Sequence, residues 1–253
     1  MGTGAITQYV DLAQLVLYLF WIFFFSLVIY LVREGKREGF PLESDRKDYA
    51  VIQGWPAIPK PKSFKLQSGE TLYAPHGRDV PENLPVRRLG NYPGSPVEPT
   101  GNPMVDGIGP AAWTKRMDIP DHMLDGSAKI IPLRATNDFS VAVQDVDPRG
   151  MQVKGCDDQV AGTITDLWVD QAEMMFRYLE MKTNGGRTIL LPINFARIKA
   201  SGISVHAITA AQFEQVPTTK NPNEVTFLEE DKIMGYFGGG KLYATPERQE
   251  PLV

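Results

Sequence analysis

Residues 12–32 carry no charged side chain, in a chain that is otherwise polar. A helix of these 21 residues is about 31 Å long, close to the hydrocarbon thickness of a bilayer. Lipid offers the backbone no hydrogen-bonding partner, so a single apolar segment of this length crosses a membrane as a helix. A cleavable signal peptide is the alternative, but residues 1–11 hold no Lys or Arg and no small-residue cleavage site follows the run. We therefore expect a transmembrane helix at residues 12–32.

The charges that flank this segment predict its orientation. Arg33, Lys36 and Arg37 follow the segment, whereas Asp11 is the only charged residue before it. Basic residues near a membrane span are retained on the cytoplasmic side. The sequence therefore predicts residues 1–11 on the outer side and the bulk of the chain in the cytoplasm.

Composition disfavours several classes of function. A net charge of -4 argues against a nucleic-acid partner. The single cysteine, Cys156, excludes an internal disulfide, and three scattered histidines argue against a structural zinc site. Residues 107–112 match a dinucleotide-binding fingerprint by letter, but no strand precedes them and Pro110 lacks the N–H that a phosphate-binding turn needs. Because no other catalytic motif is present either, an enzyme with its own active site is disfavoured.

Residues 33–128 are rich in proline. Fourteen of the 20 prolines lie between Pro41 and Pro132, which rules out long helices and central strands there. A free linker is one interpretation. The aromatic content of the segment exceeds that of most disordered linkers, so we favour an extended surface region that is ordered against another protein.

From residue 129 to residue 253 the sequence changes to short β-like runs. Turn sequences such as DPRG and TNGG separate these runs, which is typical of a small antiparallel barrel or sandwich. A capping box at Thr226 and Glu229 predicts a C-terminal helix at about residues 226–238, and the glycines 238–240 are expected to end it. The expected strands are residues 129–133, 139–143, 160–169, 174–181, 188–191, 196–198 and 203–208.

One charged group stands out within these runs. If residues 174–181 form a strand, Arg177 shares a face with apolar residues such as Leu179 and needs a carboxylate partner. Asp170 and Glu173, in the turn before the strand, are the nearest candidates. Coupled carboxylates at a partly buried surface can take up and pass on protons. An ordinary salt bridge that holds a β-turn is the alternative, and the sequence leaves both open.

The chain resembles the H subunit of purple-bacterial photosynthetic reaction centres over nearly its whole length. The resemblance begins with DLAQLVLYLFWIFFFSLVIYLVREGKREGFPLE and continues, in the same order, through PKPKSF, EPTGNPMVDGIGPAAW, VAGTITDLWVD, RYLE, TILLP and EVTFLEEDKIMGY. It implies a single transmembrane helix, an extended region and a mainly-β cytoplasmic domain built on a small antiparallel PRC barrel.

The resemblance also implies which molecules surround the subunit, where it is located and what it does. Such a subunit is not the principal binding partner of any cofactor. It caps the L and M subunits, which hold bacteriochlorophyll, bacteriopheophytin, quinones, non-haem iron and carotenoid. Membrane lipids, a cytochrome subunit and light-harvesting antenna polypeptides are the further neighbours it implies. The location would be the bacterial inner (intracytoplasmic) membrane, with the N-terminus in the periplasm. The implied work is to stabilise the complex and to support proton transfer to the secondary quinone.

Functional residues carry over by position. The resemblance assigns proton transfer to a set of charged residues, Asp121, Asp125, Asp170, Glu173, Arg177, Glu224 and Glu230, and lipid contact to Tyr30 and Lys62. Some family members carry two histidines after the Asp-Gly at the proton entrance, where this chain has Ser127 and Ala128. His122 could substitute for them, or could be an ordinary loop histidine. A membrane-tethered adaptor whose barrel binds another protein complex is the alternative function.

Overall fold

The computed structural model describes residues 11–43, 51–75, 83–92 and 94–249. Residues 1–10 of the predicted periplasmic segment lie outside this description. The chain folds as two compact units. The first comprises residues 1–82 and 88–97, and the second comprises residues 83–87 and 98–253.

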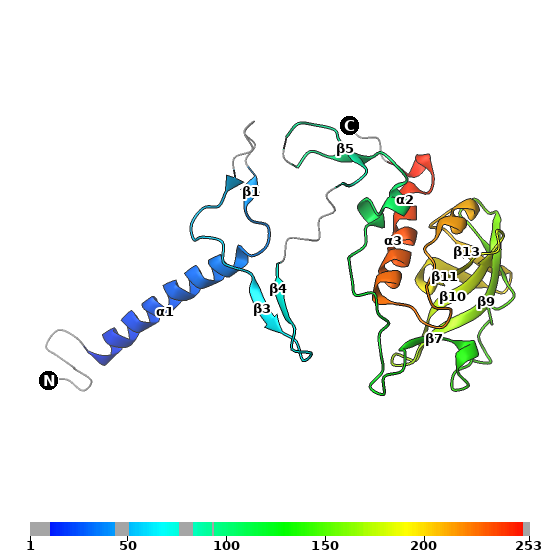
Figure 1. Ribbon diagram of the computed structural model, residues 1–253, viewed down its shortest axis with the longest axis horizontal. Helices are drawn as coiled ribbons and strands as arrows, with labels where there is room; N and C mark the ends of the chain where they lie inside the picture. The colour runs from blue at the N-terminus through cyan, green and yellow to red at the C-terminus, as the bar shows by residue number, and fades with distance from the viewer. Residues whose placement is uncertain (1–10, 44–50, 76–82, 93, 250–253) are drawn as a thin grey trace. The chain divides into compact units, whose positions relative to one another are not determined.

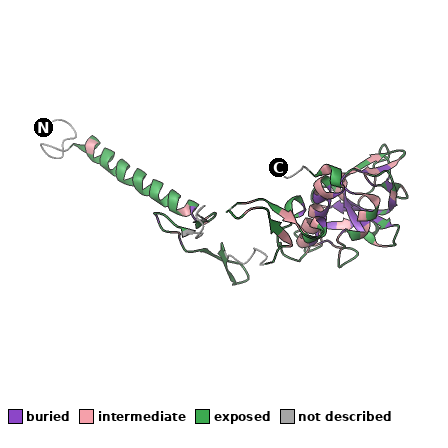
Figure 2. Cartoon of the chain, turned by 90° about the horizontal axis from the view of Figure 1, so that it is seen from above, coloured by how far each residue is buried: buried purple, intermediate pink, exposed green. Residues whose placement is uncertain are grey.

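The first unit begins with the expected apolar helix. Helix α1 (Leu12–Gly35) starts where the Asp11 carboxylate accepts a hydrogen bond from the backbone N–H of Gln14 at 2.7 Å. It continues three residues beyond the predicted end at Val32, and none of its residues is buried. Among the described residues α1 is the one helix long and apolar enough to cross a membrane, and Figure 2 shows it almost entirely in the colour of exposed residues.

Short hairpins follow α1. Strand β1 (Leu42–Glu43) pairs with β2 (Val51–Ile52), and β3 (Lys62–Lys65) pairs with β4 (Thr71–Ala74), both antiparallel. A third pair joins β5 (Val86–Arg88) and β6 (Val97–Pro99). The buried Lys36 donates from its ammonium group to the carbonyls of Gln53, at 2.9 Å, and Pro56, at 2.7 Å. These contacts satisfy the Lys36 ammonium within the first unit.

The second unit is built on one strongly curved, seven-stranded sheet (Figure 1). The strand order is β11-β10-β9-β8-β13-β12, with β7 paired to β9; all pairings are antiparallel except β8 with β13. The strands are β7 (Ile130–Pro132), β8 (Gln152–Lys154), β9 (Val160–Asp170), β10 (Met175–Thr183), β11 (Thr188–Pro192), β12 (Ala196–Lys199) and β13 (Gly202–Val205). The expected mainly-β domain is confirmed.

Short 3-10 turns follow several of the strands and a longer helix, which closes the core. The turns are η2 (Leu133–Ala135), η3 (Ile193–Phe195), η4 (Ala210–Gln215) and η5 (Pro246–Arg248). Helix α3 (Phe227–Tyr243) buries Ile233, Tyr236 and Phe237 in the core that the strands share. Figure 2 shows that the buried residues gather in this sheet and helix.

The expected end of the C-terminal helix was wrong. Its capping box at Thr226 and Glu229 is present, but α3 runs through glycines 238–240 to Tyr243. A Cβ on Gly239 would lie 2.4 Å from the Cβ of Ala111, and one on Gly240 would lie 2.3 Å from Cγ2 of Ile208. The glycines therefore allow α3 to pack closely on its neighbours and do not terminate it.

The segment that packs on α3 comes from the proline-rich region. Helix α2 (Pro103–Asp106) and the turn η1 (Gly109–Ala111) contact α3, and both Met104 and Ala111 are buried. The second unit therefore begins earlier in the sequence than residue 129, the predicted start of the cytoplasmic domain.

The expected strand at residues 139–143 is absent. Within the described part of the chain this segment pairs with no other strand, and the backbone N–H of Asp145 donates to the carbonyl of Ala142 in a turn. Val143 is fully exposed, while Phe139 and Val141 pack on the core. A β-like composition alone does not form a strand, because a strand also needs a neighbouring strand to pair with.

Candidate functional site: a charged cluster at the end of strand β9

Asp170 is the centre of the site. It is the last residue of β9, and its side chain is 0% exposed. Its Oδ1 atom accepts hydrogen bonds from the backbone N–H groups of Ala172 and Glu173, both at 3.0 Å, which fixes the turn into β10. Its Oδ2 atom faces two cations, with Nε of Arg177 at 3.4 Å and Nζ of Lys129 at 3.6 Å.

Glu173 has the most solvent-exposed side chain of the group. Its side chain is 47% exposed, and its Oε2 atom accepts a hydrogen bond from Nη2 of Arg177 at 2.9 Å. Its Oε1 atom lies 3.9 Å from Nζ of Lys129, which also lies 3.5 Å from Oδ2 of Asp121. We call these five residues the open cluster: Asp121, Lys129, Asp170, Glu173 and Arg177.

The open cluster holds three carboxylates and two cations. Burial opposes the charged form of Lys129, but the Asp170 and Asp121 carboxylates outweigh it and raise the pKa of the ammonium. Lys129 therefore stays charged near neutral pH. By formal charge, the three carboxylates and two cations of the open cluster sum to -1.

The expected position of Arg177 on an apolar face needs correction. A bulge in the pairing of β9 with β10 falls between Phe176 and Tyr178, at Arg177 itself. The bulge breaks the two-residue alternation, so Arg177 does not share the buried face with Leu179. Its side chain is 39% exposed and turns back to the carboxylates of the open cluster. The predicted pairing of Arg177 with Asp170 and Glu173 is nevertheless confirmed.

Glu230 lies nearby but has a different partner. Its Oε2 atom accepts a hydrogen bond from the buried hydroxyl of Tyr178 at 2.7 Å. Burial raises the pKa of Glu230, and the Tyr178 hydrogen bond and the positive charge of Arg177 partly offset this. Glu230 and Arg177 line the same cavity of about 300 Å³, together with Arg116 and Asp231. Glu230 is thus a partly buried acid beside the open cluster.

Asp125 and Glu224 are not joined to the open cluster by any ion pair or hydrogen bond between described residues. Asp125 lies in an exposed turn, where its carboxylate accepts hydrogen bonds from the hydroxyl of Ser127, at 2.7 Å, and its backbone N–H, at 2.9 Å. These bonds hold the pKa of Asp125 below its usual range. Glu224 accepts a hydrogen bond from the side chain of Asn221 at 3.0 Å.

The two predicted lipid-contact residues belong to the first unit. Tyr30 is an exposed residue of α1, and Nζ of Lys62 lies 2.8 Å from Oε2 of Glu34. Lys62, Glu34, Arg37 and Phe64 line a cavity of about 380 Å³ at the C-terminal end of α1. A lipid role for Tyr30 and Lys62 remains a prediction.

A second charged group on β9 and β10 was missed at the sequence level. Nη1 of Arg134 lies 2.7 Å from Oε2 of Glu180 and 3.0 Å from Oδ2 of Asp166. Glu180 also accepts hydrogen bonds from Nε1 of Trp168 and the hydroxyl of Thr165, both at 3.0 Å. We call Arg134, Asp166 and Glu180 the closed cluster. The signal was present, since Glu180 stands between two apolar residues in a strand sequence.

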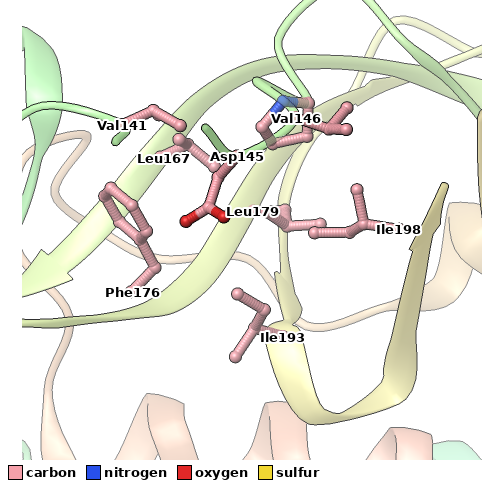
Figure 3. Close-up of a pocket in the computed structure, with 9 residues that line it drawn as sticks. Val141, Asp145, Val146, Leu167, Phe176, Leu179, Ile193 and Ile198 are labelled. Atoms are coloured by element: carbon pink, nitrogen blue, oxygen red, sulfur yellow. The ribbon is translucent and has the colours of Figure 1, made fainter. Parts of the chain in front are cut away.

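An apolar cavity of about 330 Å³ lies on another part of the sheet (Figure 3). Leu167, Phe176, Leu179 and Ile193 surround it, and the carboxylate of Asp145 points into it. This cavity contains no member of the open cluster.

The described residues contain no group of three or more His, Cys, Asp or Glu side chains arranged to hold a metal ion.

Comparison with protein families gives two matches. The model of the photosynthetic reaction centre H-chain N-terminal region matches residues 4–135, and the model of the PRC-barrel domain matches residues 141–212. The first match alone covers more than half of the 253 residues. The chain therefore belongs to the photosynthetic reaction centre H-chain family, and its curved sheet is a PRC barrel.

Proposed function

We propose that this H subunit caps the L and M subunits on the cytoplasmic side of the membrane and that its open cluster passes protons to the secondary quinone. In this proposal α1 anchors the chain in the inner membrane, with the N-terminus in the periplasm. The pigments, quinones and iron are bound by the L and M subunits. An antenna and a cytochrome subunit would be further neighbours of the complex.

The half-exposed Glu173 carries the proton-transfer part of this proposal. Reduction of a quinone to quinol consumes two protons at a site that must exclude bulk water, so fixed acids and waters have to deliver them. Glu173 contacts two cations on one side, and about half of its side chain is open to a partner or to water. Asp170 is already held by two backbone N–H groups, so Glu173 is the carboxylate that is free to reorient.

The partly buried acid Glu230 supports the same proposal. Its raised pKa brings its proton binding closer to neutral pH, as a proton-carrying group requires. Because Arg177 lines the cavity that Glu230 also lines, protonation of Glu230 would change the electrostatic field that Arg177 and Glu173 experience.

The proposal is tested by Glu173→Gln, a nearly isosteric change that removes the ionisable group. We expect slower proton-coupled transfer of the second electron and unchanged primary charge separation, measured by flash spectroscopy on the assembled complex. Glu98→Gln is the matched control, because Glu98 is also a partly exposed, ion-paired carboxylate, but it pairs with Arg87 outside the open cluster. Second-electron kinetics that are unchanged in Glu173→Gln from about pH 6 to pH 9 would reduce Glu173 to a structural ion pair.

The orientation has its own test. Protease added to sealed vesicles with the cytoplasmic face outward should digest most of the chain after Arg33. Inside-out and right-side-out vesicles from the same preparation provide the control. Protection of the barrel in the first preparation and digestion in the second would reverse the proposed topology.

A further inference from the structure

A basic cavity of about 450 Å³ lies in the second unit, and no member of the open cluster lines it. Three parts of the chain line it: η3 with the strand β12, the residues that follow β13, and the end of α3 with η5. Its lining contains the cationic residues Arg197, Lys241 and Arg248 together with His206, and it contains no Asp or Glu. In a chain of net charge -4, such a concentration of positive charge calls for an explanation.

Arg248 is held rigidly at this site. Its Nη1 atom donates to the carbonyls of Ala207 and Gly240, and its Nη2 atom donates to the carbonyl of His206, all at 2.8 Å. The Gly240 carbonyl belongs to the last turn of α3, so Arg248 offsets the partial negative charge at that end of the helix. This role accounts for Arg248 within the fold.

Arg197 and Lys241 have no comparable role. Among the described residues neither forms an ion pair with a carboxylate, and the Lys241 ammonium lies 5.3 Å from the centre of the Phe195 ring. The end of α3 attracts Lys241, but Arg197 lies on β12 and is exposed. Two cations that face one cavity without an acidic partner repel each other unless an anion lies between them.

We propose that this cavity binds the phosphate group of an organic phosphate. Guanidinium groups match phosphate oxygens geometrically, and three cations suit a multivalent anion better than a single carboxylate. The cavity is larger than inorganic phosphate requires, and Phe195, Ala196 and Ala207 add an apolar surface for the rest of the ligand. A soluble organic phosphate and a phospholipid headgroup share this chemistry.

The test is calorimetric titration of the detergent-solubilised full chain, together with any subunits that purify with it. Phenyl phosphate represents a soluble organic phosphate, dihexanoyl phosphatidylglycerol represents a lipid headgroup, and inorganic phosphate lacks the apolar body. We expect one of the two organic probes to bind more tightly than inorganic phosphate, and its binding to weaken as salt increases. The organic probe that binds identifies the source of the ligand.

The double variant Arg197→Gln/Lys241→Gln should weaken binding at least about tenfold, since each substitution removes a charge-assisted contact. Arg248 is left intact because its three hydrogen bonds support the fold. Lys182→Gln removes an exposed charge from β10, outside this cavity, and should leave binding unchanged. Absence of binding by both organic probes, or equal affinity in the double variant, would overturn the proposal. Because no electron-transfer measurement is involved, this result is independent of the proton-transfer proposal.

Discussion

The open and closed clusters both involve strands β9 and β10 and both combine carboxylates with an arginine, yet they differ in exposure. In the closed cluster the side chains of Asp166 and Glu180 are 9% and 10% exposed, and the two residues are direct cross-strand partners. In the open cluster Asp170 is fully buried, whereas about half of Glu173 is accessible. Both acids on β9, Asp166 and Asp170, are thus buried, and the exposed carboxylate in this comparison is Glu173 in the turn after β9.

The difference shows that hydrogen bonding, more than charge, separates a structural acid from a candidate proton carrier. Glu180 accepts hydrogen bonds from Arg134, Trp168 and Thr165, so protonation would disrupt several contacts at once. Glu173 accepts one side-chain hydrogen bond at 2.9 Å and has a longer contact of 3.9 Å with Lys129. A change in its proton occupancy disturbs less of the structure.

The largest expected effect tests the structural role of the closed cluster. Glu180→Gln weakens the hydrogen bonds that the nearly buried carboxylate accepts from Arg134, Trp168 and Thr165, and it should lower the free energy of unfolding by about 2 kcal/mol. Pulse proteolysis of the assembled complex across a urea series measures this loss. Glu173→Gln is the comparison and should cost less than about 1 kcal/mol, since its ion pair is exposed. Equal losses at the two positions would remove the distinction between the clusters.

A smaller effect should depend on pH and involves Glu230. Its pKa is raised in the folded state, so the folded chain binds more protons than the unfolded chain and loses stability as the pH rises above the ordinary value of 4.5. Glu230→Gln lacks this loss. The stability gained by Glu230→Gln should therefore be absent at low pH, grow through the window above pH 4.5 and level off above the raised pKa. Thermal denaturation of the complex over a pH series measures it.

Tyr178→Phe sharpens that measurement. The Tyr178 hydroxyl donates to Glu230 and favours its ionised form, so this variant should lose stability more steeply than wild type as the pH rises. If both variants follow the wild-type pH profile, Glu230 is not the group responsible.

The smallest effect is expected at Asp125. Asp125→Asn removes an exposed charge but keeps an oxygen that can accept the hydrogen bonds of Ser127, so the turn should persist. Other surface acids can still collect protons, and we expect flash spectroscopy to show a weaker slowing of second-electron transfer than in Glu173→Gln. An effect as large as that of Glu173→Gln would place a required proton entrance at Asp125.

Local patterns in the sequence predicted much of this architecture. The apolar run predicted α1, the short β-like runs between turn sequences predicted most of the barrel strands, and the capping box at Thr226 predicted the start of α3. The association of Asp170 and Glu173 with Arg177 was also predictable, because one turn separates them.

Features that depend on long-range pairing were not predictable in this way. Lys129 and Asp121 join the open cluster only because β7 pairs with β9, with Ile130 opposite Asp170. The closed cluster likewise depends on η2 bringing Arg134 to β9. The bulge at Arg177 follows from the register of two whole strands, which no local pattern specifies.

The glycines of α3 have a consequence for comparing this chain with others of its family. A Cβ on Gly235 would lie 2.7 Å from the carbonyl oxygen of Ala111, and Gly239 and Gly240 are tighter still. A relative with a larger residue at any of these positions must hold its helix farther from the neighbouring backbone. The residues at positions 235, 239 and 240 therefore indicate, from an amino-acid sequence alone, which family members share this helix spacing.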